Sequence, residues 1–385
     1  MLKIEELRNS LRKRPGELKR LRSEGKKVVG YFPGDYVPEE LIHSAGAIPI
    51  CFIHGGDPES VEAAHVLVSR FVCPFARAQF GYRVIGEQPY YELLDMLAAP
   101  ITCQNLRRTA DLWNHTTDLD VFRIGVPHAY NSEDGLKYFY NTLIRFQEKL
   151  EQVTGNRVEE EKLKNSINLY NRLRGLLREI SLLRTAQDLA ISMRDFVFLN
   201  HASYLLDPDL MVNTLDSLLN ELKTEGPARS GDGRARILLT GPCLALGDMK
   251  ILDLVDESGG DVVVEEVCEG VRCYWENVDV KGDQIQNLAV RYLQKRWPAA
   301  FMRMSAQPRL ENILSLVEDF RVDGVLWYQL KYCETYDFEC FYAARKLEEK
   351  GVPFIKLESE YDVSDRGPLK TRIEAFIESL TKRRS

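Results

Sequence analysis

Short apolar runs that alternate with helical patterns occur in two separate parts of this sequence, and this alternation restricts the fold more than any other feature. Strands are predicted over 26–32, 47–52 and 121–126 in the first part, and over 236–240, 261–267, 324–330 and 352–357 in the second. Helices are predicted over 39–45 and 91–98, from about residue 133, and over 369–380. Because alternating strands and helices form parallel sheets covered on both faces, we expect an α/β protein with one such sheet in each half.

The stretch between these two parts has a different pattern. From Val158 to Lys223, apolar residues recur every three or four positions, as in Leu163, Ile167, Tyr170, Leu173, Leu177 and Ile180. This spacing predicts a helical insert. The following Gly231-Asp232-Gly233 lacks the third glycine of a dinucleotide-binding motif and precedes a strand, so we interpret it as a linker. The predicted organisation is an N-terminal α/β lobe over 1–155, a helical segment over 156–228 and a C-terminal α/β lobe over 229–385.

Composition and charge indicate which binding partners and which cellular compartment to expect. The 385 residues are 44% hydrophobic, which is enough for two or three ordinary cores, and carry a net charge of −7. That charge gives no electrostatic reason to expect nucleic acid or an anionic membrane as a partner. The first ten residues are charged where a secretory signal would be apolar, and no stretch approaches eighteen apolar residues. We therefore expect a cytoplasmic protein.

The eight cysteines are the residues most suggestive of chemistry. In a reducing compartment they are either buried thiols or metal ligands, not disulfides. Ligand sites of open parallel sheets lie at the carboxyl ends of the strands, so cysteines placed there are candidates. Cys243, Cys268 and Cys333 directly follow predicted strands, Cys103 precedes a helical pattern, and Cys73 precedes a proline. Their wide spacing forms no compact motif, so the spacing alone leaves both roles open.

Five segments carry a resemblance to a known family. They are KVVGYFPGDYVPEELIHSAGAIPI, CPFARAQFG, ITCQNLRR, LKYCETYDFE and LESEYDVSDRGPLKTRIEAFIE, and they occur in order over both lobes. Together they resemble the 2-hydroxyacyl-CoA dehydratase and benzoyl-CoA reductase family. The resemblance implies two Rossmann-like parallel-sheet lobes with a helical insert between them. It also implies a 4Fe-4S cluster held between the lobes by Cys73, Cys103 and Cys333.

The chemistry implied by this resemblance is the reduction or dehydration of an acyl-CoA thioester. Three thiolates leave one iron without a protein ligand, and an open position is what distinguishes a catalytic metal site from a structural one. A substrate oxygen could bind there, and a low-potential electron could then reduce the thioester carbonyl. The resemblance also implies a homologous sister subunit or a homodimer, and a separate ATP-hydrolysing iron–sulfur activator. The chain has no GxxxxGK[ST] phosphate loop, so such an ATPase has to be a partner.

Two other functions remain open at this stage. One is a homodimeric reductase of small molecules with a double-cubane 8Fe-9S cluster, as in a branch of the same family. Three extra ligands could come from among four further cysteines, namely Cys51, Cys243, Cys268 and Cys273, and Cys243 and Cys268 are the possible further ligands that we name first. Cys340, on a predicted helix, is expected to pack in the core. The other function is a non-catalytic scaffold whose cysteines are merely buried.

Two candidates for an acid or base of the reaction lie close to the first predicted strand. His43 and Glu40 lie on the helix predicted after that strand, where a thioester site can recruit a proton donor or acceptor. The segment resembles a family motif near the substrate. The alternative is that Glu40 is favoured in a first helical turn simply by the helix dipole.

Overall fold

The computed structural model describes residues 2–231 and 233–384 and contains two separate four-stranded sheets, each entirely parallel. The first sheet has the order β2-β1-β3-β4 and the second β6-β5-β7-β8. The strands are β1 (Val28–Tyr31), β2 (Ile48–Cys51), β3 (Met96–Ile101), β4 (Asp120–Gly125), β5 (Ala235–Thr240), β6 (Gly260–Glu266), β7 (Gly324–Leu330) and β8 (Phe354–Ser359). Of the predicted linker, Asp232 lies outside the described residues, as do Met1 and Ser385 of the predicted lobes.

The helices fall into three consecutive groups along the chain. The first group is α1 (Leu2–Ser23), α2 (Glu39–Ser44), α3 (Pro58–Ala63), α4 (Pro74–Ile85), α5 (Gln104–Thr116) and α6 (Glu133–Thr154). The second is α7 (Glu160–Leu182), α8 (Met193–Ser203) and α9 (Pro208–Thr224). The third is α10 (Lys250–Glu257), α11 (Val271–Tyr274), α12 (Gln284–Ala289), α13 (Ala306–Asp319), α14 (Glu334–Glu349) and α15 (Arg366–Arg384). Short turns of helix are η1 (Ala64–Val66), η2 (Leu183–Thr185) and η3 (Val290–Lys295).

The two sheets have the same topology. In each sheet, the strand that comes first in the chain lies between the second and the third. The order in which strands are added therefore reverses beside this strand, between β1 and β3 in one sheet and between β5 and β7 in the other. Such switch points are where open α/β sheets bind ligands, at the carboxyl ends of the strands. The prediction of two Rossmann-like parallel-sheet lobes joined by helices is therefore confirmed, whereas the exact division into domains stays a prediction.

One predicted element was wrong. Residues 91–98 were expected to be helical, but 91–95 form turns and the strand β3 begins at Met96. Met96, Leu97, Ala98 and Ala99 of β3 are good helix formers by intrinsic propensity. However, β3 pairs with β1 on one side and β4 on the other and is almost wholly buried, so the tertiary environment outweighs that preference.

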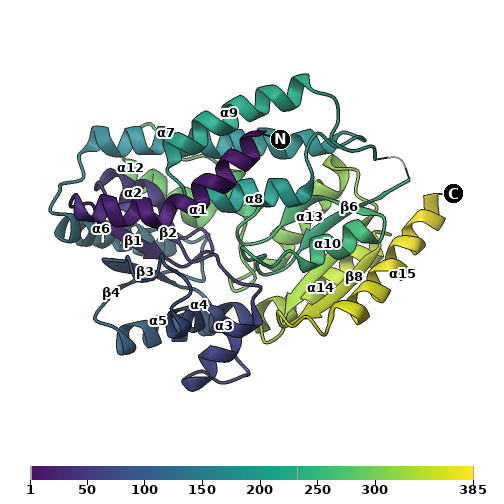
Figure 1. Cartoon of the computed structure of the whole chain (residues 1–385), viewed down its shortest axis with the longest axis horizontal. Coiled ribbons are helices and arrows are strands. Elements are labelled where there is room, and N and C mark those ends of the chain that lie inside the picture. The colour runs from purple at the N-terminus through teal and green to yellow at the C-terminus, as the bar shows by residue number, and fades with distance from the viewer. Residues whose placement is uncertain (1, 232, 385) are drawn as a thin grey trace.

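The helical insert connects the two lobes. Figure 1 shows β1 to β4 at the left, the C-terminal lobe with β6 and β8 at the right, and α7 and α9 along the top. α7 packs against α9 and against α2 of the first lobe. Its buried face includes Leu173, Leu177 and Ile180, which belong to the predicted periodic pattern. None of the helices in the described ranges combines the length and apolar character needed to cross a membrane.

The loops that follow β2 and β5 meet backbone to backbone. Leu246 N–H donates to the carbonyl of Ile53 at 2.7 Å, and Gly55 N–H donates to the carbonyl of Leu246 at 3.1 Å. A Cβ added at Gly56 would lie 2.5 Å from the carbonyl carbon of Gly247, so only glycine permits this approach. The contact fixes the two lobes with the carboxyl ends of their strands turned toward each other.

Candidate metal centre

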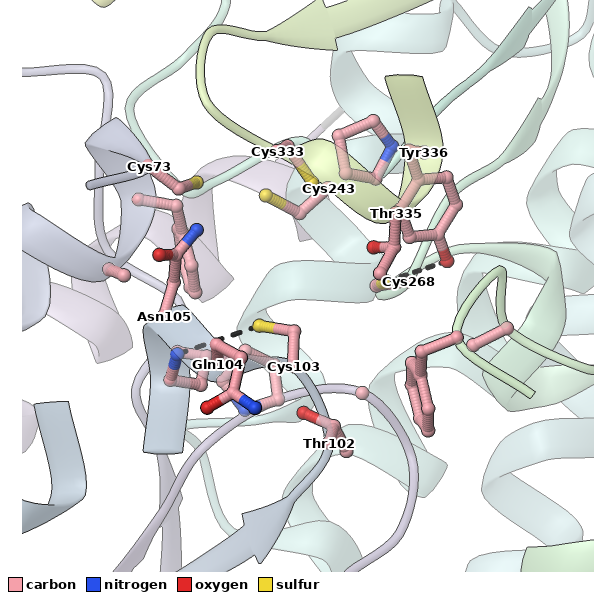
Figure 2. Close-up of a pocket in the computed structure, with 18 of the residues that line it drawn as sticks. Cys73, Thr102, Cys103, Gln104, Asn105, Cys243, Cys268, Cys333, Thr335 and Tyr336 are labelled. Atoms are coloured by element: carbon pink, nitrogen blue, oxygen red, sulfur yellow. Dashed lines mark hydrogen bonds between the residues drawn. The ribbon is translucent and has the colours of Figure 1, made fainter. Parts of the chain in front are cut away.

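Five cysteines from both lobes line one cavity where the carboxyl ends of the two sheets face each other. Cys103 follows β3 and Cys333 follows β7, the strands that hold equivalent places in the two sheets. Cys243 follows β5 and Cys268 follows β6, while Cys73 lies between β2 and β3. Figure 2 shows Cys73, Cys243 and Cys333 above the space, Cys103 below it and Cys268 to its right. The structure thus brings together the five cysteines that lie near strand or helix ends in the sequence.

Cys73, Cys103 and Cys333 share a local structure that sets them apart. Each is the residue immediately before a helix, namely α4, α5 and α14. Pro74 at the first position of α4 keeps Cys73 extended, with a φ of −47° and a ψ of 133°. Unpaired N–H groups and the helix dipole make a helix N-terminus favourable for negative charge, including that of a thiolate. Three such ends around one cavity favour an anionic group bound there.

The cavity itself is mainly apolar. Its volume is about 130 Å³, close to the ~150 Å³ of an engineered cavity that takes up benzene, so it can hold a compact group of a few heavy atoms. Besides the cysteines it is lined by Pro33, Gly34, Tyr36, Phe75, Ala76, Thr102, Gln104, Asn105, Leu106, Pro242, Glu269, Ala299, Phe301, Glu334, Thr335 and Tyr336. An apolar, sulfur-lined space of this kind suits an iron–sulfur cluster, which thiolate ligands hold and whose properties depend on the hydrophobic residues around it.

The cysteines surround the cavity and do not converge on one point. Within 2–231 and 233–384, no three His, Cys, Asp or Glu residues are grouped so that they could hold a single metal ion. In a cubane each thiolate binds a different iron, so the sulfurs lie around the cluster. The donor set therefore fits a cluster better than a single ion such as zinc.

Protonation of the thiols differs between the members of the set. A hydrogen bond from Cys333, together with the N–H groups of Ala76 and Phe75, lowers the pKa of Cys73. The same pairing with Cys73, followed by burial, raises the pKa of Cys333 well above its ordinary value. Cys73 is thus the first of the two to become a thiolate.

The remaining cavity thiols are held neutral in the protein without metal. Burial raises the pKa of Cys103 to about 11, even though the N–H of Leu106 donates to its sulfur at 3.5 Å (dashed line in Figure 2). Burial also raises the pKa values of Cys243 and Cys268. Since only thiolates bind iron, loading this site with metal has to release protons.

Glu269 is a functional candidate that the sequence interpretation missed. It directly follows Cys268, lines the cavity and is 1% exposed. Its Oε2 accepts the N–H of Leu244 at 3.2 Å, and its Oε1 has no hydrogen-bond partner among the described residues. Burial raises the pKa of this carboxyl to about 7. In the sequence, the segment VCEGVRC places charged residues directly after a predicted strand, and this pattern could have indicated Glu269.

The other predicted site residues lie elsewhere. Glu40 is completely buried, where Arg174 donates to it at 2.8 Å and the hydroxyl of Tyr292 at 2.7 Å. His43 Nδ1 lies 2.5 Å from the hydroxyl oxygen of Ser166. Neither belongs to the described lining of the cavity. These contacts hold α2 against α7, which gives both side chains a structural task.

The three cysteines left over are also outside the cavity lining that the structure describes. Cys273 donates its thiol to the carbonyl of Cys268 at 2.8 Å. Cys51 is fully buried at the end of β2, and Cys340, which lies on α14, packs in a small cluster with Trp327 of β7. Of the further ligands considered for a double cubane, the structure brings Cys243 and Cys268 to the cavity but not Cys51 or Cys273.

Comparisons with known proteins support one family throughout. A family model described as 2-hydroxyglutaryl-CoA dehydratase, D-component, matches residues 35–380. YjiM of Escherichia coli (strain K12), provisionally assigned as a dehydratase subunit, is 27% identical over 366 residues, covering 94% of this chain and 93% of the relative. One of the subunits of benzoyl-CoA reductase from Thauera aromatica is 24% identical over 358 residues, covering 92% and 91%. The beta subunit of (R)-2-hydroxyglutaryl-CoA dehydratase of Acidaminococcus fermentans is 23% identical over 370 residues, covering 94% and 95%.

The family model and these relatives extend over both lobes, and the matched range includes every cysteine that lines the cavity. The names of the Thauera and Acidaminococcus relatives are those of subunits of a reductase and a dehydratase of CoA thioesters. This confirms the resemblance found in the sequence: the chain belongs to the 2-hydroxyglutaryl-CoA dehydratase D-component family.

Proposed function

We propose that this chain is the iron–sulfur subunit of an enzyme that dehydrates a 2-hydroxyacyl-CoA or reduces an aryl-CoA such as benzoyl-CoA. Cys73, Cys103 and Cys333 would hold a 4Fe-4S cluster between the lobes. The observation that carries the proposal is that all three precede a helix and line the same apolar cavity. The names of the relatives support the same two reactions.

The chain's own residues would prepare the cavity for a thioester. Tyr36, Phe75 and Phe301 contribute aromatic surface that excludes water from the cysteines. When bound, the cluster would supply low-potential one-electron chemistry at an iron without a protein ligand. Glu269 presents its Oε1 atom, which has no partner among the described residues, and can hold a proton beside the substrate. The catalytic role predicted for His43 and Glu40 stays a prediction, and neither residue belongs to the described lining of the cavity.

Partners complete the proposal. The relatives are named as subunits, which supports a homologous sister subunit, although a homodimer is the alternative. A separate ATP-hydrolysing iron–sulfur activator would deliver the electron, because this sequence lacks a phosphate-binding loop of its own. We keep the cytoplasm as the proposed compartment, since it maintains cysteines as reduced thiols.

A second candidate function rests on one specific observation. Cys243 and Cys268 line the same cavity as the other three cysteines, so more thiols are available than a single cubane requires. This favours the alternative of a double-cubane 8Fe-9S cluster and a reductase of small molecules.

Metal and sulfide content distinguishes these functions. The chain is purified without oxygen, and iron and acid-labile sulfide are counted per chain. About four irons support a single cubane and about eight a double cubane. A chain that contains neither iron nor sulfide, even after reconstitution with ferrous iron and sulfide, is the scaffold, and the proposed enzyme function is then wrong.

A further inference from the structure

The sulfur of Cys268 has two side-chain hydrogen-bond donors on the wall of the cavity. Arg272 Nη1 lies 3.5 Å from this sulfur, and the hydroxyl oxygen of Tyr336 lies 3.6 Å from it. Figure 2 shows Cys268 beside Tyr336, with the contact as a dashed line. Cys103, by contrast, receives a backbone N–H, from Leu106. Cys268 therefore has surroundings built from side chains, like those that orient and tune the ligands of metal sites.

The two donors are arranged so that both have a proton for the sulfur. Arg272 Nη1 donates to the hydroxyl oxygen of Tyr336 at 2.5 Å. A guanidinium can only donate, so the tyrosine oxygen is the acceptor and its own O–H is free to point elsewhere. Cys268 is the acceptor within reach of that proton. The second hydrogen on Nη1 is likewise available to Cys268.

The guanidinium that organises this arrangement is held rigidly. Arg272 is 1% exposed and donates to both carboxylate oxygens of Glu266, at 2.5 and 2.7 Å, and to the carbonyl of Gly241 at 2.9 Å. Glu266 is shared with Arg309, which donates to it at 2.9 Å and whose guanidinium lies 4.9 Å from the ring centre of Tyr336. Because the donors of the Arg272 guanidinium are all used, this group is held in one position, and its hydrogen bond fixes the phenol of Tyr336.

We propose that Arg272 and Tyr336 are positioning residues that act on the cluster through the sulfur of Cys268, and that they raise the reduction potential of the cluster. This inference rests on the second candidate function, the double-cubane cluster, because it requires more cysteine ligands than Cys73, Cys103 and Cys333 provide. Hydrogen bonds to a sulfur ligand and nearby positive charge both stabilise the added electron and so raise the reduction potential. In the double cubane Cys268 serves as a ligand beyond the three cysteines that precede helices, whereas a single cubane with an open iron takes no fourth thiolate.

The test compares two variants that each lose one buried phenolic oxygen. Tyr336→Phe removes the hydroxyl beside Cys268. Tyr274→Phe is the matched control, because Tyr274 is 1% exposed and its hydroxyl contacts Ser181 and Glu265, at 3.2 and 2.8 Å. Iron content and the midpoint potential, from an EPR-monitored redox titration, are measured on the anaerobic chain. We expect Tyr336→Phe to keep its iron and to have a more negative potential, and Tyr274→Phe to match the wild type.

The route through the sulfur is tested in a Cys268→Ala background. If this variant loses iron, Cys268 is a ligand, as proposed. Two results overturn the inference: a Cys268→Ala variant with the full iron content of the wild type, or an iron-loaded Tyr336→Phe variant with the wild-type potential. A wild-type chain with about four irons contradicts the double cubane instead, and one with no iron contradicts the proposed function.

A measurement on the wild type tests the inference even if a variant does not fold. Both donors carry exchangeable protons, so ENDOR spectra of the reduced cluster before and after transfer to heavy water should lose a proton coupling. Spectra without an exchangeable coupling would contradict hydrogen bonds to a sulfur of the cluster.

Discussion

Glu40 offers the clearest separation of a structural role from a catalytic one. Its carboxylate is 0% exposed and accepts hydrogen bonds from Arg174 and Tyr292 at 2.8 and 2.7 Å. Removing one partner of a buried ion pair leaves the other charge uncompensated, which costs about 3–5 kcal/mol. Glu40→Ala should therefore lose about that much free energy of unfolding. Tyr292→Phe, which removes one hydrogen bond to the same charge, should lose about 1.5–3 kcal/mol.

The assay is urea unfolding of the metal-free chain at neutral pH, followed by circular dichroism. The iron content of the variants is measured in parallel on anaerobic protein, and variants that remain folded should bind iron as the wild type does. The structural role is refuted if Glu40→Ala loses less than about 1 kcal/mol while the loaded enzyme loses its activity. That result would make Glu40 an acid or base of the reaction.

Three other predictions concern single positions. Gly81→Ala would place a Cβ 1.6 Å from the carbonyl oxygen of Ser60, so it should lower the free energy of unfolding in urea by about 3 kcal/mol or more. Gly175→Ala, with open space around it, should raise the free energy of unfolding by about 0.5–1 kcal/mol. Equal effects of the two substitutions would contradict the close packing of α3 on α4. Burial raises the pKa of Asp248 from 3.8 to about 6, so the native state binds a proton more tightly and stability should fall as pH rises from 4 to 6, by about 3 kcal/mol at 1.36 kcal/mol per pKa unit. Asp248→Asn should abolish that slope, and an unchanged slope would show that another group causes it. Phe301→Ala should enlarge the cavity and raise the preference for larger acyl-CoA thioesters about tenfold in kcat/KM, and an unchanged preference would place the acyl group elsewhere.

The strands that sequence patterns predicted are those rich in β-branched residues. The runs around Val28, Val262 and Val325 are short, apolar and bounded by turn residues, and each became a strand. β3 was missed because its Met, Leu and Ala residues are good helix formers and only its position between β1 and β4 makes it a strand. Local preference does not contain that information, because it depends on segments far away in the chain.

The site was predictable as far as strand ends indicate it. Cys103 and Cys333 follow strands or precede helices, and the rule for parallel sheets places such residues at one edge. The sequence could not indicate that Glu40 turns toward α7, because Arg174 and Tyr292 lie 134 and 252 residues away. Nor could it indicate the donors to Cys268, since one of them, Tyr336, comes from a helix 68 residues further along the chain.

The central claim is that Cys73, Cys103 and Cys333 together hold one iron–sulfur cluster, and iron bound per chain in single cysteine variants tests it most directly. Each of the three is replaced by Ala, and Cys340→Ala is the matched control, because Cys340 is 3% exposed and packs against Trp327 outside the described cavity lining. We predict that each of the three variants loses most of its iron and its visible cluster absorbance, while Cys340→Ala keeps both. Wild-type iron and absorbance in Cys103→Ala would contradict the claim.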